Sequence, residues 1–106
     1  MSTPAGGRVT RNQVVQRWGT PQATFGSVNE PRTREEHGVR FNERWTYRRR
    51  GDDPCEPRER TIYWHRYDFV AAFVLRDDGT LVREDESTLL AKIPARLYIP
   101  PRQRTV

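Results

Sequence analysis

Cysteine and long apolar runs are both scarce in this sequence. The single cysteine, Cys55, cannot form a disulfide within the chain. Zinc needs about four ligands, and Cys55, His37 and His65 lie too far apart in the sequence to supply a closely spaced pair. No stretch of about eighteen consecutive apolar residues occurs. We therefore expect a chain without a disulfide, a zinc site or a transmembrane segment.

Lysine is almost missing as well. Eighteen of the nineteen basic residues are arginine, and the exception is Lys92. Codon usage in a GC-rich genome accounts for such an excess, and so does selection for planar, bidentate contacts to carboxylate or phosphate. The formal net charge of +5 makes weak association with nucleic acid or anionic lipid a physical property of the chain. It does not make either association the function.

The motifs of common catalytic sites are also absent from the sequence. It contains no glycine-rich phosphate loop and no G-x-S-x-G or H-E-x-x-H pattern. Cys55 lies among acidic residues, which disfavour a reactive thiolate. His65, beside Arg66 and Asp68, is typical of a surface residue, and the acidic group at residues 84–86 lacks the ligand spacing of a calcium loop. We expect no enzymatic activity, no metal and no cofactor.

The apolar residues that are present suffice for one small domain. The 106 residues include three Trp, four Tyr and four Phe, and 34% of the chain is hydrophobic against 31% charged. We expect a flexible N-terminal tail over residues 1–9, a single α+β domain over residues 10–93 and a proline-rich C-terminal tail over residues 94–106. Residues 1–9 contain no apolar segment of the kind found in signal peptides.

A short helix is predicted over residues 10–18. Thr10 and Gln13 form a capping-box pattern, in which each side chain accepts a hydrogen bond from the other residue's backbone. Val14 and Trp18 stand one turn apart and place an apolar stripe on one face. Gly19 suits the position at which a helix ends. Because so short a helix is not stable alone in water, its apolar stripe must pack on the rest of the fold.

Strands are predicted for the middle of the chain. Residues 39–48 alternate apolar and polar side chains, which indicates a strand with one buried face and one wet face. Residues 61–76 have strong strand propensity but are long for a single strand. They either bend near residues 65–68 or pair as one long strand with residues 39–50. In both cases we expect antiparallel pairing between the two segments.

The last predicted elements follow an Asp-Gly turn at residues 78–79, which indicates a hairpin returning over residues 81–84. Asp85 or Ser87 then caps a second short helix through Lys92, or this segment is extended. Together the elements predict an α+β fold with one or two short helices packed on a three-stranded antiparallel β-meander. The predicted core consists of Val14, Val15, Trp18, Phe41, Trp45, Tyr47, Phe73 and Leu81.

Five arginines are the candidate partner-binding residues. Arg40, Arg44 and Arg48 are spaced by four residues and are predicted to share the wet face of the strand over residues 39–48. Arg49 and Arg50 follow directly. Arginine is favoured at interfaces because its planar fork pairs with carboxylates and stacks on rings. The alternatives are a solvated face, a contact with lipid headgroups and a nucleic-acid site formed with neighbouring aromatic residues.

Three segments resemble a known family, the small outer-membrane lipoproteins of the BamE (SmpA/OmlA) type. Residues 10–21 resemble the helix and Gly-x-Pro exit of that family, residues 45–47 its Trp-x-Tyr strand, and residues 70–82 its two strands around an Asp/Asn-x-Gly turn. The resemblance implies helices on a three-stranded antiparallel sheet, similar also to β-lactamase inhibitory protein modules. It further implies a non-enzymatic role in which a partner lipoprotein and anionic lipid are bound.

We therefore predict a protein-interaction or scaffolding module with a protein partner. The expected setting is the bacterial cell envelope, on the periplasmic side of the outer membrane, if a leader has been removed, and the cytoplasm otherwise. We expect a monomer, and contacts with anionic lipid headgroups stay open. The alternatives are a basic nucleic-acid-binding module, whose affinity would fall steeply with salt, and a stand-alone bacterial protein that shares the fold.

Overall fold

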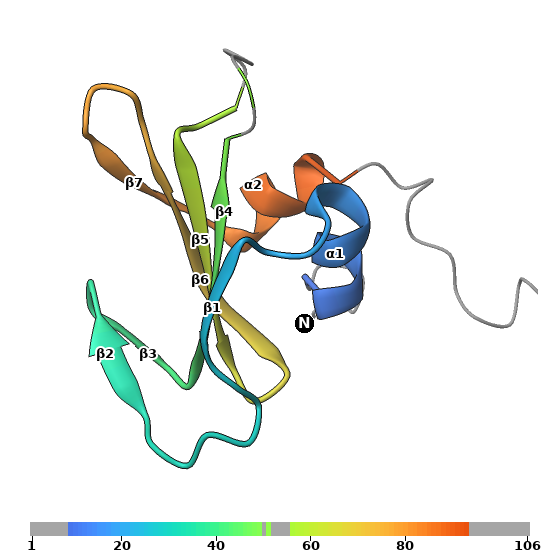
Figure 1. Ribbon diagram of the computed structural model, residues 1–106, viewed down its shortest axis with the longest axis vertical. Coiled ribbons are helices and arrows are strands. Elements are labelled where there is room, and N and C mark those ends of the chain that lie inside the picture. Colours follow the sequence, from blue (N-terminus) through green and yellow to red (C-terminus); the bar gives the residue numbers. More distant parts are fainter. Residues whose placement is uncertain (1–8, 50, 52–55, 94–106) are drawn as a thin grey trace, which may run out of the picture.

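The computed structural model describes residues 9–49, 51 and 56–93. Arg50, Cys55 and all of the predicted tails except Val9 lie outside the described residues. Helices α1 (Arg11–Trp18) and α2 (Glu86–Ala91) lie on one side of a five-stranded sheet, and a hairpin of β2 (Arg34–Glu36) and β3 (Val39–Phe41) lies on the other (Figure 1). The main sheet contains β1 (Ala23–Gly26), β4 (Glu43–Arg48), β5 (Glu59–His65), β6 (Asp68–Leu75) and β7 (Leu81–Glu84), in the order β1-β4-β5-β6-β7.

All neighbouring strands of the main sheet are antiparallel. β4 and β5 pair with Trp45 opposite Ile62, as predicted for the two long segments. The second segment bends, since β5 ends at His65 and β6 begins at Asp68. The α+β class and the antiparallel sheet are thus confirmed. The predicted three-stranded meander describes only part of the sheet, because β1 adds to β4 and the β2–β3 hairpin forms a second sheet.

Helix α1 begins at the predicted capping box. The Thr10 hydroxyl accepts a hydrogen bond from the Gln13 backbone N–H at 3.1 Å, and the Gln13 side chain accepts one from the Thr10 backbone N–H at 3.0 Å. Val14 is fully buried, whereas Val15 is 39% exposed and is not part of the core. Val9 is also buried, and its backbone N–H donates to Glu86 at 2.7 Å, so Val9 packs with the domain.

Asn42 interrupts the strand that was predicted over residues 39–48. Its backbone N–H donates to the Trp64 carbonyl at 3.0 Å, and its side chain donates to the Glu30 carbonyl and accepts from the Arg66 backbone N–H. The strand that ends just before Asn42, β3, belongs to the hairpin, and the strand that begins just after it, β4, belongs to the main sheet. Apolar residues on either side of Asn42 therefore pack against opposite faces of the main sheet, although their alternation in the sequence is unbroken.

The turns of the two hairpins and the N-cap of α2 agree with the residues found there. The β2–β3 turn has positive φ at both central residues, His37 and Gly38, as a type I′ hairpin requires. The predicted Asp-Gly hairpin is confirmed between β6 and β7, with Gly79 at φ 88°. Asp85 caps α2 by accepting from the Thr88 backbone N–H at 2.8 Å, so this segment is helical rather than extended.

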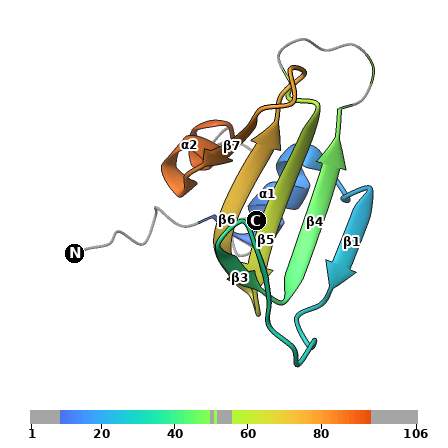
Figure 2. The same cartoon turned by 90° about the vertical axis from the view of Figure 1, so that its left-hand side faces the viewer.

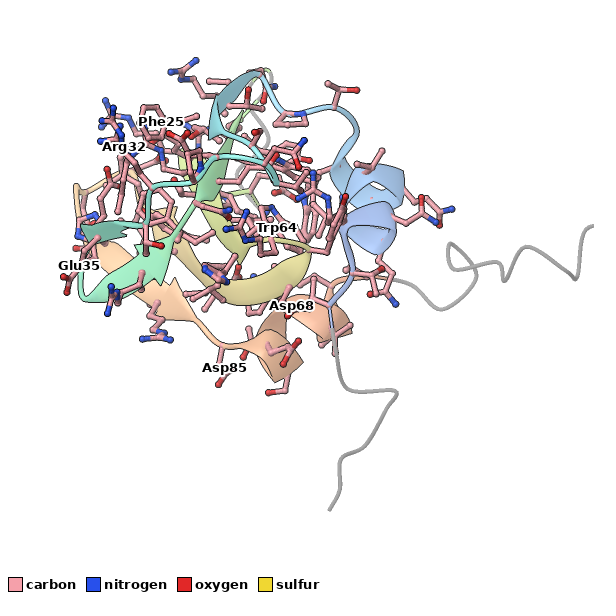
Figure 3. The ribbon with its side chains drawn as sticks, turned by 90° about the horizontal axis from the view of Figure 1, so that it is seen from below. Phe25, Arg32, Glu35, Trp64, Asp68 and Asp85 are labelled. Atoms are coloured by element: carbon pink, nitrogen blue, oxygen red, sulfur yellow. The ribbon has the colours of Figure 1, made fainter. Side chains whose placement is uncertain are left out.

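Two apolar clusters lie on opposite faces of the main sheet. The cluster under the helices consists of Val9, Val14, Trp45, Tyr47, Ile62, Trp64, Ala72 and Leu89, with Trp18 packed against it. The cluster under the hairpin consists of Val39, Phe41, Tyr63, Ala71 and Phe73. Figure 3 shows Trp64 inside the fold and Glu35 pointing outward from the hairpin. Of the predicted core residues, Leu81 is 43% exposed because it lies on the edge strand β7.

Candidate functional site

The structure separates the arginines that the sequence placed in one row. Arg44 and Arg48 lie on the hairpin side of β4, but Arg40 lies on β3 between buried Val39 and Phe41 and faces away from the main sheet. Arg49 pairs with Asp77 at 3.0 Å. Arg50 lies outside the described residues. The prediction that Arg40 shares a face with Arg44 and Arg48 is wrong, because the chain changes sheets at Asn42.

We call the hairpin side of the main sheet the open face. Cross-strand register places Arg48, Glu59, Leu75 and Leu81 in one row across β4, β5, β6 and β7. The hairpin covers the other end of this face, where Phe41 contacts Tyr63 with ring centroids 4.8 Å apart. Figure 2 views the open face directly, with the hairpin in front of its lower part and the upper part uncovered by the described elements.

Arg44 is held by contacts within the protein. Its guanidinium pairs with Glu36, lies 5.0 Å from the Phe25 ring centroid, and shares Glu36 with the Tyr63 hydroxyl, which donates at 2.8 Å. Burial alone would raise the pKa of Glu36, but the hydrogen bonds from Arg44 and Tyr63 outweigh it and lower that pKa. Arg44 therefore fastens the hairpin to the sheet and is a poor candidate for a free binding residue.

Arg48 is the freer of the two arginines on the open face. Its side chain is 61% exposed, and its pair with Glu59 has a separation of 3.3 Å. Its backbone N–H donates to the Gln22 side chain at 3.1 Å, which fixes the start of the side chain. A hollow of about 330 Å³ lies beside it. The residues around this hollow are Ala23, Glu36, His37, Arg44, Thr46, Arg48, Glu59, Thr61, Tyr63, Phe73, Leu75 and Leu81.

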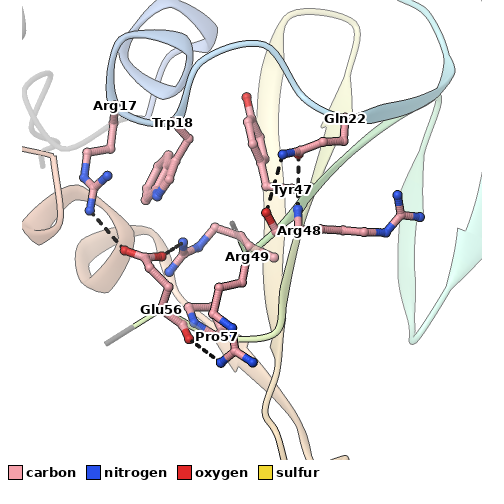
Figure 4. Close-up of a pocket in the computed structure, with 9 residues that line it drawn as sticks. Arg17, Trp18, Gln22, Tyr47, Arg48, Arg49, Glu56 and Pro57 are labelled. Carbon is pink, nitrogen blue, oxygen red and sulfur yellow. Dashed lines mark hydrogen bonds and ion pairs between the residues drawn. The ribbon is translucent and has the colours of Figure 1, made fainter. Parts of the chain in front are cut away.

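A second hollow lies on the helix side, and we call it the helix-side groove. It has a volume of about 260 Å³ and is lined by Arg17, Trp18, Gln22, Tyr47, Arg48, Arg49, Glu56, Pro57 and Arg60 (Figure 4). Arg17 and Arg60 each donate to one carboxylate oxygen of Glu56 at 3.3 Å. Arg49 donates to the Glu56 backbone carbonyl at the same distance. Three guanidinium groups thus converge on one residue.

Arg60 forms the floor of this groove and is only 3% exposed. It donates to both carboxylate oxygens of Glu84, at 3.2 and 3.3 Å, and Lys92 also pairs with Glu84. Burial on its own would raise the pKa of Glu84, but the hydrogen bonds from Arg60 and Lys92 outweigh it and lower that pKa. The Arg60 guanidinium also lies 4.6 Å from the Trp18 ring centroid.

Sequence reasoning missed this groove. The only local signal was that Arg60 stands two residues before Ile62, so that it shares a face of β5 with apolar residues. An arginine in that register faces the buried side of the sheet and needs a carboxylate nearby. Its partner, Glu84, lies twenty-four residues further along the chain, where the sequence shows it only as part of the acidic group at residues 84–86. The structure instead buries Glu84.

The histidines are not brought together with catalytic partners in the described part of the chain. His37 packs on Phe73 with ring centroids 5.3 Å apart, and His65 is exposed at the end of β5. Among residues 9–49, 51 and 56–93, no group of three or more His, Cys, Asp or Glu side chains could hold a metal ion. Neither α1 nor α2 is long enough to cross a membrane.

Comparison with known proteins identifies no relative: no family model, no curated protein and no solved structure matches this chain. The resemblance of residues 10–21, 45–47 and 70–82 to the BamE-type lipoproteins therefore stays a prediction. The geometry of the two hollows is the basis for the functional proposals.

Proposed function

We propose that this chain is a non-enzymatic protein-interaction module that binds an acidic, partly apolar segment of another protein across its open face. The observation that carries the proposal is the row in which exposed Arg48 and half-exposed Leu81 stand at opposite sides of one hollow. No described element of the chain covers this row, whereas the other end of the same face is covered by the hairpin.

The chemistry of the hollow selects the class of partner. Its β4 side carries the positive charge of Arg48, and its β6–β7 side is apolar at Leu75 and Leu81. Arginine is enriched at protein interfaces, and apolar area beside it contributes affinity when it is removed from water. The net charge of +5 attracts an acidic partner over distance. A segment with carboxylates on one side and aliphatic groups on the other is complementary to both walls.

The bacterial envelope is the setting that we propose for this interaction. Its support is the resemblance of the helix, the aromatic strand and the Asp-Gly hairpin to the BamE-type lipoproteins. Recovery of the native protein in the cytoplasmic fraction of its source cells would contradict this setting. It would leave the binding proposal unaffected, because that proposal rests on the open face alone.

The binding proposal predicts a charge-specific loss in one variant. The probe is a synthetic peptide of alternating glutamate and leucine, and its affinity is measured by fluorescence anisotropy at moderate salt. Arg48→Glu should weaken binding about tenfold or more, because it places a negative charge against the glutamates of the peptide on the β4 side of the hollow. Arg40→Glu is the matched control: it makes the same change in net charge on the outer face of the hairpin, and we expect a far smaller effect.

Two outcomes would overturn the proposal. Equal losses in Arg48→Glu and Arg40→Glu would show general attraction by net charge rather than a site. Absence of peptide binding, together with tight, steeply salt-dependent binding of a single-stranded oligonucleotide, would favour the nucleic-acid alternative. Both variants change exposed side chains, so their unfolding curves should match that of the wild type.

A further inference from the structure

We propose that the helix-side groove is a binding site for a small ligand carrying a carboxylate next to an apolar or aromatic group, and that the Glu56 carboxylate occupies this site in the free protein. The groove lies on the opposite side of the sheet from the open face. Arg48 contributes to the linings of both hollows, but the arginines that contact Glu56 do not line the open-face hollow, so the two proposals are tested with different variants.

The arrangement around Glu56 is that of a carboxylate recognition site. Arg17 donates to one carboxylate oxygen and Arg60 to the other, and Arg49 donates to the backbone carbonyl of the same residue. Figure 4 shows Arg17 and Arg49 approaching Glu56 from different sides. Guanidinium groups bind planar carboxylates through paired N–H donors. The Glu56 carboxylate thus stands where a ligand carboxylate would be held.

Glu56 holds this position weakly. Both contacts of its carboxylate are 3.3 Å long, whereas hydrogen bonds between a guanidinium and a carboxylate are typically about 2.7–2.9 Å. The side chains of Arg17 and Glu56 are each about one third exposed, and ion pairs at that exposure contribute little to stability. An incoming carboxylate can therefore replace Glu56 at small cost while keeping the guanidinium groups paired.

Trp18 supplies the second, independent observation. Its indole Nε1 is buried and has no hydrogen-bond partner among the described residues. A buried donor without an acceptor is unfavourable, and in Figure 4 this nitrogen points toward the part of the groove that holds Glu56. A ligand with a further oxygen acceptor would satisfy it.

The walls and the volume define the rest of the ligand. The rings of Trp18 and Tyr47, with centroids 6.3 Å apart, form the apolar wall. A volume of about 260 Å³ lies below the usual range of about 300–1,000 Å³ for drug-sized ligands. The groove therefore fits a group of the size of a benzoate rather than a nucleotide.

The test follows the indole N–H signals of the three tryptophans by nitrogen-15 NMR during titration. Benzoate is the main probe, benzamide is its uncharged counterpart of the same shape, and inorganic phosphate tests for a general anion site. Benzoate should shift the Trp18 signal in a saturable manner, and benzamide should not. Trp64 is the internal reference, because its Nε1 is also buried without a partner but does not line the groove.

Three variants distinguish specific binding of benzoate in the groove from general attraction by surface charge. Glu56→Gln keeps the size of the side chain but removes the competing carboxylate, so benzoate affinity should rise about tenfold. Arg17→Gln should lower it by a similar factor. Arg58→Gln removes the same charge from an exposed residue that does not line the groove, and it should change nothing.

The proposal fails if the Trp18 signal does not saturate with benzoate, if benzamide shifts it equally, or if Glu56→Gln binds no more tightly than the wild type. An equal response to phosphate would overturn the assignment to carboxylates. If Arg17→Gln does not fold, the Glu56→Gln comparison decides alone, because it alters a one-third-exposed side chain. Loss of peptide binding in Arg48→Glu does not affect any of these outcomes.

Discussion

Glu43 is a carboxylate on the buried side of β4, and its surroundings explain why it is tolerated there. Arg11 of α1 donates to both carboxylate oxygens, at 2.6 and 3.2 Å, and the Trp45 indole N–H donates at 2.8 Å. The same guanidinium lies 4.7 Å from the Trp45 ring centroid. This cluster ties the short helix α1 to the sheet through contacts that the helix could not form alone.

Removal of Arg11 should therefore destabilise the fold. Arg11→Met keeps the aliphatic part of the side chain but leaves Glu43 charged and without its guanidinium. We expect a loss of about 2–3 kcal/mol in the free energy of unfolding, measured by urea denaturation. The double variant Arg11→Met with Glu43→Gln should recover part of this loss, because no charge is then left unpaired. A loss no larger than that of Arg58→Met would contradict the role of Arg11.

Individual residues were predictable from the sequence where their partners are close in the chain. Thr10 and Gln13 cap each other three residues apart, and both contacts form. The role of Glu43 was not predicted, because its partner Arg11 is thirty-two residues away in the chain. Arg60 on the helix side was missed for the same reason. Charged residues at apolar positions indicate a partner but do not identify it.

Among the elements, α1, the β4–β5 pairing and the β6–β7 hairpin follow from periodicity and turn chemistry. β1 and the β2–β3 hairpin do not, because β1 and β2 are short and largely exposed. The alternation over residues 39–48 also conceals the break at Asn42, since odd-numbered residues are buried on both sides of it. Periodicity shows that a side chain is covered but not which layer covers it. This ambiguity misplaced Arg40 in the candidate site.

The close approach of β1 to Asn42 gives a prediction at this scale. Gly26 has φ 76°, and a Cβ atom there would lie 2.1 Å from the Asn42 carbonyl oxygen. Gly26→Ala should lower the free energy of unfolding by more than about 2 kcal/mol, because it adds a backbone collision to the strain of positive φ. Gly19→Ala is the matched control, with φ 81° but open space around the added carbon.

Thermal and urea denaturation should show different losses in the free energy of unfolding for the two glycine variants. Gly19→Ala carries only the conformational strain of its backbone, which is about 1–3 kcal/mol, and Gly26→Ala should lose more than this. Hydrogen exchange should locate the effect of Gly26→Ala at β1 and at the β4 residues that pair with it. Equal losses in the two variants would show that β1 moves away from Asn42 without cost.

At the scale of the whole molecule, the helices cover one face of the main sheet and the hairpin covers part of the other, and a carboxylate fastens each of these layers to the sheet. Glu36 joins the hairpin to Arg44 and Tyr63 on the open face. Glu84 joins α2, through Lys92, to Arg60 on the helix side. These contacts add to the apolar packing of the two clusters, and the pair of buried Arg60 with buried Glu84 is the less screened of the two. The stability of the molecule should therefore depend on the ionisation of these two carboxylates.

This dependence has a definite sign. Both carboxyl groups have pKa values lowered from the usual 4.5, in each case because hydrogen bonds from cationic or hydroxyl partners outweigh the effect of burial. The unfolded chain then binds protons at a higher pH than the folded chain, so the free energy of unfolding is fully maintained above pH 4.5 and decreases as the pH falls through the lowered values. Buried Glu84 contributes a slope of at most about 1.4 kcal/mol per pH unit, and solvent screening makes the contribution of the 39% exposed Glu36 smaller.

Urea denaturation across the acid range should show this loss and assign it. Glu84→Gln should be less stable than the wild type at pH 7, since Arg60 is left buried without its carboxylate, and its stability should fall less steeply below pH 4.5. Glu35→Gln removes an exposed carboxyl from the outer face of the hairpin and should leave the curve unchanged. If Glu84→Gln loses stability in acid as steeply as the wild type does, Glu84 is not the group that fastens the helix layer to the sheet.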